Sequence, residues 1–347
     1  MILKIKSLEQ KRIVEKLSNQ FISMSKKTRK KKNVKKYKKS RKRRKTIYSK
    51  TKGGKFSKKM RKKSNGKKIK YIKENCAPKN KEETLPYTCY TVKGLHKIKN
   101  IWNKKHPDNK ITSNDPKKIW NNLRYAFNNT CDKESCWLKH KCIKEDIDLE
   151  TKEYTFTPSA PKEWKKKPNE WLTSIDILEV MKQYEKTYKC FEFLGPSPID
   201  YDTHKMYGEC VWEELCEFNL GKAIKNGKKK IGIIFNLDKH TQPGSHWVAL
   251  FINTKKNKIY YMDSYGEDIP KKINEFSEKV IKQAVSQKLG NYELIESDIR
   301  HQYGDSECGM YSLYFIIKML KGMSFKTFTK TRIKDSEMKK MRKKWFN

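Results

Sequence analysis

A cysteine stands where a polar loop passes into an apolar helix near the end of the chain. The stretch HQYGDSECGMYSLYFIIKML covers residues 301–320, and its apolar positions recur at helical spacing after Cys308. A thiol in the first turn of a helix lies at the positive end of the helix dipole, which favours the thiolate. Cys308 is therefore a candidate nucleophile, although an isolated cysteine is more often a small buried residue. A base, a group that orients the base and an oxyanion donor would decide between the two.

His246 and Asp263 have the residue types of a general base and of the carboxylate that orients it. His246 begins the run HWVALFIN after a Pro-Gly-Ser loop, and Asp263 follows seventeen residues later at the end of KIYYMD. Since two such runs joined by a short turn pair as antiparallel strands, both side chains are expected at one edge of a sheet. The carboxylate would fix the tautomer of the imidazole and stabilise its protonated form. The imidazole would take the proton of Cys308.

Gln302 precedes Cys308 by six positions and lies in the loop that leads to the helix. Its amide N–H groups are candidate oxyanion donors beside the backbone N–H of the cysteine. Taken alone, the histidine is more often packed, the aspartate could belong to a plain turn, and the glutamine could be any surface amide. The joint order and placement of the residues favour a catalytic set.

The elements around these residues predict an α+β fold. The runs KKIGIIFNLD, HWVALFIN and KIYYMDS are β-rich and have short connections, which favours an antiparallel meander, and YELIESDI is predicted as a further strand. The run WLTSIDILEVMKQYEKTY is predicted as a helix capped by Thr173 or Ser174. The expected architecture is a central, mostly antiparallel sheet between helices. The run PKKINEFSEKVIKQAVSQKL is predicted as an amphipathic helix whose apolar stripe consists of Ile273, Phe276, Val280, Ile281, Ala284 and Val285.

Upstream of the catalytic residues, the chain divides by composition. Two helical patterns follow one another, LHKIKNIWNKKH and DPKKIWNNLRYAF, and Asp115-Pro116 supplies the N-cap and the first helical residue of the second. The segment 156–170 is rich in Pro and Lys and is predicted as a linker. The expected domains are a basic arm, a small helical accessory domain and a catalytic domain, with the bounds 1–80, 85–155 and 165–340.

The positive charge is concentrated near the start of the chain. The sequence has 82 Lys and Arg against 39 Asp and Glu, a net charge of +43, and residues 26–70 hold 26 of the basic residues and no acidic one. A run of this kind cannot bury enough apolar surface to fold, so a disordered arm is predicted, after a short amphipathic helix within residues 1–24. Its expected partner is nucleic acid, bound through phosphates and acting at most as a non-covalent activator. The alternative is a nuclear-localisation or solubilising tail.

Nine cysteines in 347 residues form no disulfide-like framework, so free thiols and a reducing compartment are expected. The sequence has neither a secretory signal nor an apolar run of membrane-spanning length, which predicts a soluble chain without a membrane partner. The spacing of four soft ligands in CDKESCWLKHKC is unlike the usual zinc patterns, so packing is favoured over zinc and no metal or cofactor is assigned. Whether these four bind metal stays open: Cys131, Cys136, His140 and Cys142.

Three blocks of the sequence, GSHWVALFIN, IYYMDSYG and HQYGDSECGMYSLYF, resemble the catalytic blocks of the Ulp/adenain cysteine proteases. That group includes SUMO-specific proteases, the adenovirus protease and polyprotein-processing proteases of large DNA viruses. The upstream runs NEWLTSIDILEVMKQYEKTY and CYTVKGLHKIKNIWN to NNTCDKESCWL are similar to the African swine fever type. The resemblance implies a papain-like or adenain-like core and these roles: His246 as base, Asp263 as its orienting group, Cys308 as nucleophile, Gln302 in the oxyanion hole, and Trp247 as a wall of the substrate channel.

The resemblance also implies a substrate class. The expected activity is a cysteine endopeptidase that cuts after Gly-Gly in viral structural polyproteins during particle maturation, in the host cytoplasm and the virion, or in the nucleus if the arm is a localisation signal. One alternative is an isopeptidase that removes a ubiquitin-like modifier, and another is a packaging protein with an inactive protease fold, which the complete catalytic set disfavours. Gly53 and Gly54 in the arm form a candidate self-cleavage site, with a flexible joint as the alternative.

Overall fold

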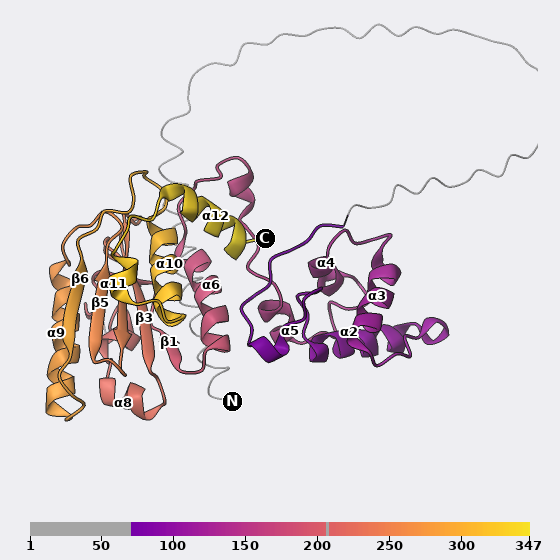
Figure 1. Ribbon diagram of the computed structural model, residues 1–347, viewed down its shortest axis with the longest axis horizontal. Helices are drawn as coiled ribbons and strands as arrows, with labels where there is room; N and C mark the ends of the chain where they lie inside the picture. Colours follow the sequence, from indigo (N-terminus) through magenta and orange to yellow (C-terminus); the bar gives the residue numbers. More distant parts are fainter. Residues whose placement is uncertain (1–70, 206–207) are drawn as a thin grey trace, which may run out of the picture. The chain divides into compact units, whose positions relative to one another are not determined.

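The structure, a computed structural model, describes residues 71–205 and 208–347 (Figure 1). The helix predicted within residues 1–24 and the basic run 26–70, which includes Gly53 and Gly54, lie outside the described residues. Within the described part, no helix has both the length and the apolar character needed to cross a membrane.

A six-stranded sheet forms the centre of the C-terminal part, in the order β1-β3-β4-β5-β6, with β2 also beside β3. The three middle strands pair antiparallel, which confirms the predicted meander. The outer strands β1, β2 and β6 pair in parallel with their neighbours, so the sheet is mixed. A parallel pair needs a crossover, and α9 (Lys271–Ser286) provides it between β5 and β6. The strands are β1 Phe191–Phe193, β2 Ser197–Pro198, β3 Lys230–Asn236, β4 Trp247–Asn253, β5 Lys258–Met262 and β6 Glu293–Ser297.

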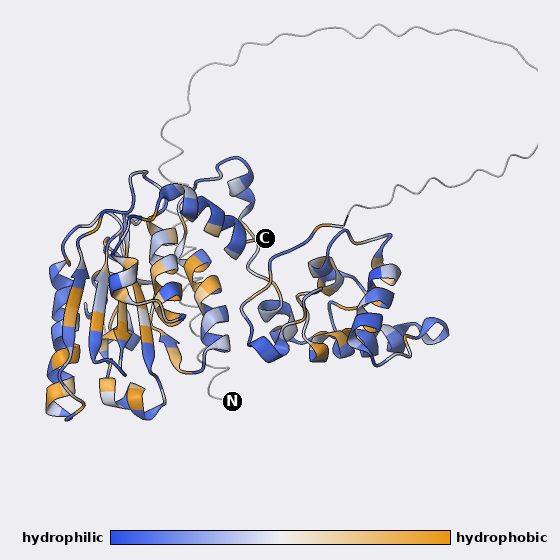
Figure 2. Cartoon of the chain, in the orientation of Figure 1, coloured by the Kyte–Doolittle hydropathy of each residue, from blue (hydrophilic) through white to orange (hydrophobic). Residues whose placement is uncertain are grey.

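Helices cover both faces of the sheet (Figure 1). Alternate residues of β3, β4 and β5 pack with α8 (Leu220–Lys225) and α9 into one apolar core. The other face contacts α10 (Cys308–Leu320), which is apolar on nearly all sides, and α6 (Ser174–Thr187) packs beside α10 and β1. Figure 2 shows hydrophobic residues along the strands and in the neighbouring helices. The predicted α+β architecture with a sheet between helices is confirmed.

Local sequence signals explain where these helices begin. Thr173 caps α6 and forms a capping box with Asp176, so the cap is the first of the two predicted residues. The predicted stripe of α9 buries Ile273, Phe276, Val280 and Ala284, whereas Val285 is 62 % exposed. Val285 follows Ala284 by about 100° around the helix and therefore turns away from the sheet, so its assignment to the buried stripe was wrong.

The upstream part is helical and has an apolar core of its own. Asp115 caps the second helix, where its carboxylate accepts the Lys118 N–H and Pro116 is the first residue, as predicted. Buried Glu134 accepts hydrogen bonds from Thr88, from the Cys89 N–H and from the Trp120 indole. These elements are η1 Lys81–Glu83, α2 Val92–Lys105, η2 Pro107–Asn109, α3 Pro116–Phe127, α4 Glu134–Lys139, α5 Leu149–Tyr154 and η3 Lys162–Lys165.

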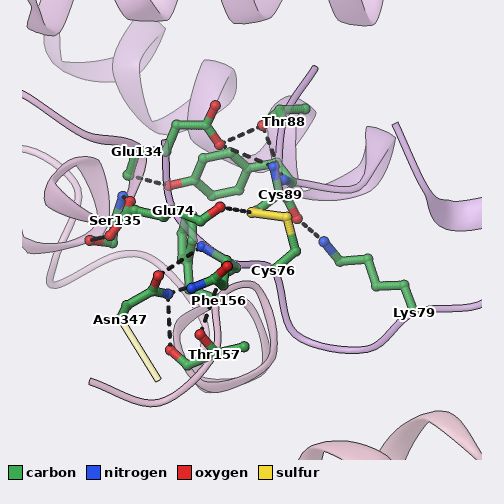
Figure 3. Close-up of a disulfide and its surroundings, with 12 residues drawn as sticks. Glu74, Cys76, Lys79, Thr88, Cys89, Glu134, Ser135, Phe156, Thr157 and Asn347 are labelled. Atoms are coloured by element: carbon green, nitrogen blue, oxygen red, sulfur yellow. Dashed lines mark hydrogen bonds between the residues drawn. A yellow bond between two sulfur atoms is a disulfide. The ribbon is translucent and has the colours of Figure 1, made fainter. Parts of the chain in front are cut away.

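The segment predicted as a linker is bonded to the rest of the fold. Phe156 forms a β-bridge with Cys76, and Ala160 N–H donates to the carbonyl of Asn347, the last residue. The side chain of Asn347 bonds to the Asn75 backbone and to the Thr157 carbonyl (Figure 3). The remaining helices are α7 Glu213–Cys216, α11 Phe325–Phe328 and α12 Asp335–Trp345.

Three disulfides correct the expectation that all thiols are free. They join Cys76 to Cys89 (Figure 3), Cys131 to Cys136, and Cys210 to Cys216. Their Cα atoms lie 5.0, 5.5 and 6.3 Å apart, a proximity that folding creates and that spacing in the sequence did not indicate. The free cysteines of the described part are Cys142, Cys190 and Cys308.

The cluster in CDKESCWLKHKC does not assemble as a four-ligand site. Cys131 and Cys136 are bonded to each other, and His140 Nδ1 lies 2.9 Å from Cys142 Sγ as a separate pair. Cys131 and Cys142 are buried in the upstream core, in agreement with the packing interpretation.

Candidate active site

Cys308 is the first residue of α10 and is 2 % exposed. The polar loop before it ends at Glu307, and the apolar residues after it insert against the sheet, so the thiol is fixed at the helix N-terminus. The first N–H groups of a helix have no acceptor within the helix and favour negative charge. This position stabilises a thiolate and provides backbone N–H groups for an oxyanion.

His246 lies directly before β4, and Asp263 lies directly after β5. The antiparallel register of the two strands, with Ala249 opposite Met262, brings their side chains to one edge of the sheet. His246 Nε2 is 2.7 Å from Asp263 Oδ1, and Asp263 is 2 % exposed. The sequence placed both residues correctly, although their catalytic roles stay predictions.

The imidazole of His246 bonds on two sides. Burial by itself lowers the pKa of His246, but hydrogen bonds to Asp263 and Cys308 and the charges of both partners raise that pKa to about 9. Since Nε2 bonds to Asp263, Nδ1 is the nitrogen left for the thiol. A raised imidazole pKa favours the protonated ring, the form from which His246 can give a proton to a leaving amine.

Tyr265 is a part of the site that sequence reasoning treated only as part of a turn. Its ring stacks on the His246 ring with centroids 4.9 Å apart, and its backbone N–H donates to Asp263 Oδ1 at 2.8 Å. The stacking restricts the rotation of the imidazole, and the backbone bond holds the carboxylate that orients it. An aromatic residue two positions after the aspartate was the available signal.

Gln302 is fully buried and held by three hydrogen bonds. Its Oε1 accepts from Ser264 Oγ at 2.7 Å, and its Nε2 donates to Tyr265 Oη and to the Gly304 carbonyl. Both amide protons are therefore engaged in this structure. Gln302 must release one of these acceptors to act as an oxyanion donor, so that role stays a prediction.

His301, the neighbour of Gln302, is not available as the base. It is fully buried, its Nδ1 accepts the Ile333 N–H at 3.1 Å, and burial together with the Arg332 cation lowers its pKa to about 4. A neutral core histidine of this kind serves packing, so His246 remains the predicted base.

Trp247 and Leu172 are bonded to each other, and Leu172 packs beside the start of α10. The Trp247 indole donates to the Leu172 carbonyl at 3.1 Å, and both side chains are at least nine-tenths buried. A Cβ on Gly309, the residue after Cys308, would lie 3.0 Å from Leu172 Cβ. The glycine thus lets Leu172 pack directly over the start of α10. Trp247 as a wall of the substrate channel stays a prediction.

The loop before His246 is held by a carboxylate that the sequence did not single out. Asp200 accepts hydrogen bonds from the His240 backbone N–H at 2.8 Å and from His240 Nδ1 at 2.7 Å. Gly244 follows in the same loop with φ +95°, a conformation that favours glycine. These contacts fix the direction from which the chain enters β4 at His246.

A buried ion pair anchors the residue directly before the nucleophile. Glu307 accepts from Arg342 Nη2 at 3.1 Å, and both side chains are more than nine-tenths buried. Arg342 belongs to α12 and also donates to the Glu170 carbonyl at 2.7 Å. The C-terminal helix therefore positions the start of α10.

A thiol at a helix N-terminus, an imidazole that bonds to it and a carboxylate behind the imidazole form a nucleophile, a base and an orienting group. The helix supplies the nucleophile, and the edge of the sheet supplies the other two. On an α+β core, this set defines a cysteine-type peptidase. The comparisons with known proteins bear this out.

Residues 220–347 match the C-terminal catalytic domain of the Ulp1 protease family. A thiol protease of Acanthamoeba polyphaga mimivirus is 33 % identical over 234 residues, which are 67 % of this chain and 75 % of the relative. A cysteine protease of African swine fever virus is 30 % identical over 226 residues, 61 % of this chain and 81 % of that protein. The chain therefore belongs to the Ulp1 family of cysteine proteases.

The crystal structure of the African swine fever virus protease has the same fold. Its TM-score is 0.57 at 24 % identity, over 81 % of this chain and 98 % of that one. The resemblance stated from the three sequence blocks is thus confirmed, including the African swine fever type and the assignment as a hydrolase.

Proposed function

We propose that this cysteine protease is an endopeptidase that cuts viral structural polyproteins after Gly-Gly pairs during particle maturation. The observation that carries the proposal is the enclosed position of the Cys308 thiol, which bonds to His246 while Asp263 holds the far side of the ring.

In the proposed reaction, the Cys308 thiolate attacks the carbonyl carbon after the Gly-Gly pair. The backbone N–H of Cys308, joined by the amide of Gln302 if it releases an acceptor, stabilises the oxyanion. The tetrahedral intermediate collapses to a thioester as protonated His246 gives its proton to the leaving amine. Neutral His246 then takes a proton from water, which attacks the thioester and releases the acid product and the thiol.

Steric enclosure supports glycine before the cut. Cys308 is 2 % exposed, and Leu172 and Trp247 pack at the start of its helix. A substrate residue that passes these side chains to bring its carbonyl to the thiol has little room for a side chain beyond Cα. Glycines satisfy this requirement at the lowest steric cost.

The second candidate is an isopeptidase that removes a ubiquitin-like modifier whose tail also ends in Gly-Gly. The African swine fever virus relatives support it, since several carry the name SUMO-1 cysteine protease. Both candidates use the same catalytic residues, so only the substrate separates them.

Cleavage of two reporters tests the proposal. The wild type should cut a Gly-Gly-X peptide much faster than a SUMO or ubiquitin fusion, and the reverse order would establish the isopeptidase. Cys308→Ala should abolish cleavage of both, while Cys190→Ala, which removes another free cysteine, should retain it. Cleavage by Cys308→Ala at the wild-type rate would contradict Cys308 as the nucleophile.

The basic run 26–70 is proposed to bind nucleic acid in the virus factory or virion. Its 26 Lys and Arg without acidic residues would give steeply salt-dependent, sequence-independent binding. A chain that starts at residue 71 should lose most of the affinity while retaining peptide cleavage. The shortened chain should begin at residue 71 and not at residue 80. Residues 71–79 belong to the fold, since the Ile72 N–H donates to the Asp132 carbonyl and Cys76 forms a disulfide with Cys89. Equal affinity of both chains would place the site elsewhere.

A further inference from the structure

Three residues with soft metal-ligand atoms meet outside the active site, on a small hairpin. Tyr201 and Trp212 begin and end it, and the Trp212 N–H donates to the Tyr201 carbonyl at 2.9 Å. His204 and Cys210 face each other across it as a β-bridge. Directly opposed residues of an antiparallel pair project on the same face, so the imidazole and the sulfur lie side by side.

The third residue, Cys216, returns to this hairpin through α7. Its N–H donates to the Trp212 carbonyl at 3.1 Å, and its own carbonyl accepts from Lys279 of α9 at 2.6 Å. Tyr201 and Leu215 are buried in the apolar core, which fixes both ends of the segment. The segment that carries the three ligands is thus anchored to the core at both ends, while His204 itself is exposed.

The distance between the imidazole and one of the sulfurs is close to that between two ligands of one metal ion. His204 Nε2 lies 3.8 Å from Cys210 Sγ, and the Nε2 and both sulfurs all lie within 4.8 Å of one another. Zinc bonds of about 2.3 Å to sulfur and about 2.0 Å to nitrogen place tetrahedral ligands roughly 3.6–3.8 Å apart. The nitrogen–sulfur separation already has this length.

We propose that His204, Cys210 and Cys216 form a binding site for a soft divalent metal of the zinc type when the two cysteines are reduced. In the structure the cysteines form a disulfide, so two equivalents of a thiol reductant must first convert it to two thiols and become a disulfide themselves. The metal ion then displaces two thiol protons and takes the lone pair of the imidazole. Water fills the fourth position on this exposed surface.

Within the described part of the chain, this is the one set of three such residues whose ligand atoms converge. The other soft-ligand cluster offers a matched comparison. Cys131 and Cys136 also form a short-range disulfide, with His140 bonded to Cys142 instead of to either of them. Two neighbouring cysteines are therefore found in both clusters. Only the hairpin also has a histidine, His204, whose ring nitrogen lies beside them.

Zinc binding by the full chain tests this site. All proteins carry Cys308→Ala, so that the active-site thiol cannot bind the ion, and are kept reduced with a phosphine. The parent should bind one Zn²⁺ per chain, measured by metal analysis after dialysis, and Cys210→Ser/Cys216→Ser should bind none. The matched pair Cys131→Ser/Cys136→Ser should bind as the parent does.

His204→Ala separates a metal site from a simple disulfide. His204 is exposed, so its loss should leave the fold and the air-oxidised Cys210–Cys216 disulfide intact while weakening zinc affinity at least tenfold. With Co²⁺ in place of Zn²⁺, the parent should show thiolate-to-metal charge-transfer absorption. His204→Ala should show this absorption only weakly. Parent protein without bound Zn²⁺, unchanged affinity in His204→Ala, or equal loss in the Cys131/Cys136 pair would each overturn the site.

Discussion

One carboxylate oxygen, Asp263 Oδ1, accepts both His246 Nε2 at 2.7 Å and the Tyr265 N–H at 2.8 Å. An asparagine keeps an oxygen that accepts both bonds but loses the charge that stabilises the imidazolium. We therefore expect Asp263→Asn to reduce kcat/KM less than Asp263→Ala, which removes the orienting group altogether.

The two substitutions should also differ in the pH profile. Asp263→Asn should move the alkaline limb of kcat to lower pH, because Asp263 contributes to the raised pKa of His246. Equal rates for wild type and Asp263→Ala would show that another group orients the ring. Ser245→Ala, a change in the exposed loop beside His246, serves as the control and should leave both quantities unchanged.

The raised pKa of His246 predicts both activity and stability as functions of pH. The folded value of about 9 lies above the ordinary value of 6.5, so the protonated ring stabilises the folded state fully below pH 6.5. That contribution to stability should disappear as the pH rises from 6.5 to 9. Turnover should fall near pH 9, where the imidazolium of His246 loses its proton.

Melting temperatures of wild type and His246→Ala, measured from pH 6 to 10, check this prediction. Their difference should shrink steadily across the window from pH 6.5 to 9. A constant difference would mean that His246 has the same pKa in the folded and unfolded protein, which would contradict the raised value, and turnover should then change near pH 6.5 instead.

The sequence predicted the elements that carry strong local signals. The β3–β4–β5 meander, the caps at Thr173 and Asp115, and the edge at which His246 meets Asp263 followed from periodicity and short connections. Each depends on neighbours within a few residues or across one tight turn.

Features that depend on distant segments were missed. The parallel pairing of β6 with β5 needs the crossover of α9, and the Cys76–Cys89 disulfide needs the fold of the upstream helices. Gln302 is predicted as an oxyanion donor, and the structure adds that the turn after Asp263 supplies two of its partners, Ser264 and Tyr265. No pattern local to Gln302 indicates those contacts.

The buried pair Glu307–Arg342 predicts a large effect on stability. Arg342→Met leaves the Glu307 carboxylate buried without its cation, which should cost about 3–5 kcal/mol of unfolding free energy. Since Glu307 adjoins Cys308, turnover should fall as well. Denaturant unfolding measures the first quantity.

Two variants control for the loss of charge and volume. Glu307→Gln/Arg342→Met should recover a part of the lost stability, because the uncompensated charge is gone. Lys340→Met breaks an exposed pair with Glu337 on the same helix and should change stability by less than about 1 kcal/mol. Equal effects of Arg342→Met and Lys340→Met would contradict a structural role of the buried pair.

Gln302 and Tyr265 give opposite predictions for the oxyanion hole. Gln302→Ala should lower kcat by about 100- to 1,000-fold with little change in KM if the amide stabilises the oxyanion. Tyr265→Phe removes one acceptor of the amide, which frees a proton for the oxyanion, so kcat should be retained. Normal kcat with raised KM in Gln302→Ala would assign the glutamine to substrate binding, and a melting curve checks that the buried site still folds.

The arm itself contains a Gly-Gly-X sequence, Lys52-Gly53-Gly54-Lys55, which the proposed specificity would make a substrate. It lies outside the described residues, within a run that has no acidic residue and is predicted to be disordered. Cleavage after Gly54 would remove 17 of the 26 basic residues of the run 26–70 and so weaken the proposed binding to nucleic acid.

Mass spectrometry should find a new N-terminus at Lys55 in the wild type and full-length chain in Cys308→Ala. Gly54→Val should block this cleavage while leaving the Gly-Gly-X peptide reporter cut at the wild-type rate, since the change is distant in sequence from every catalytic residue. Full-length chain in all three proteins after long incubation at high concentration would leave Gly53-Gly54 as a flexible joint.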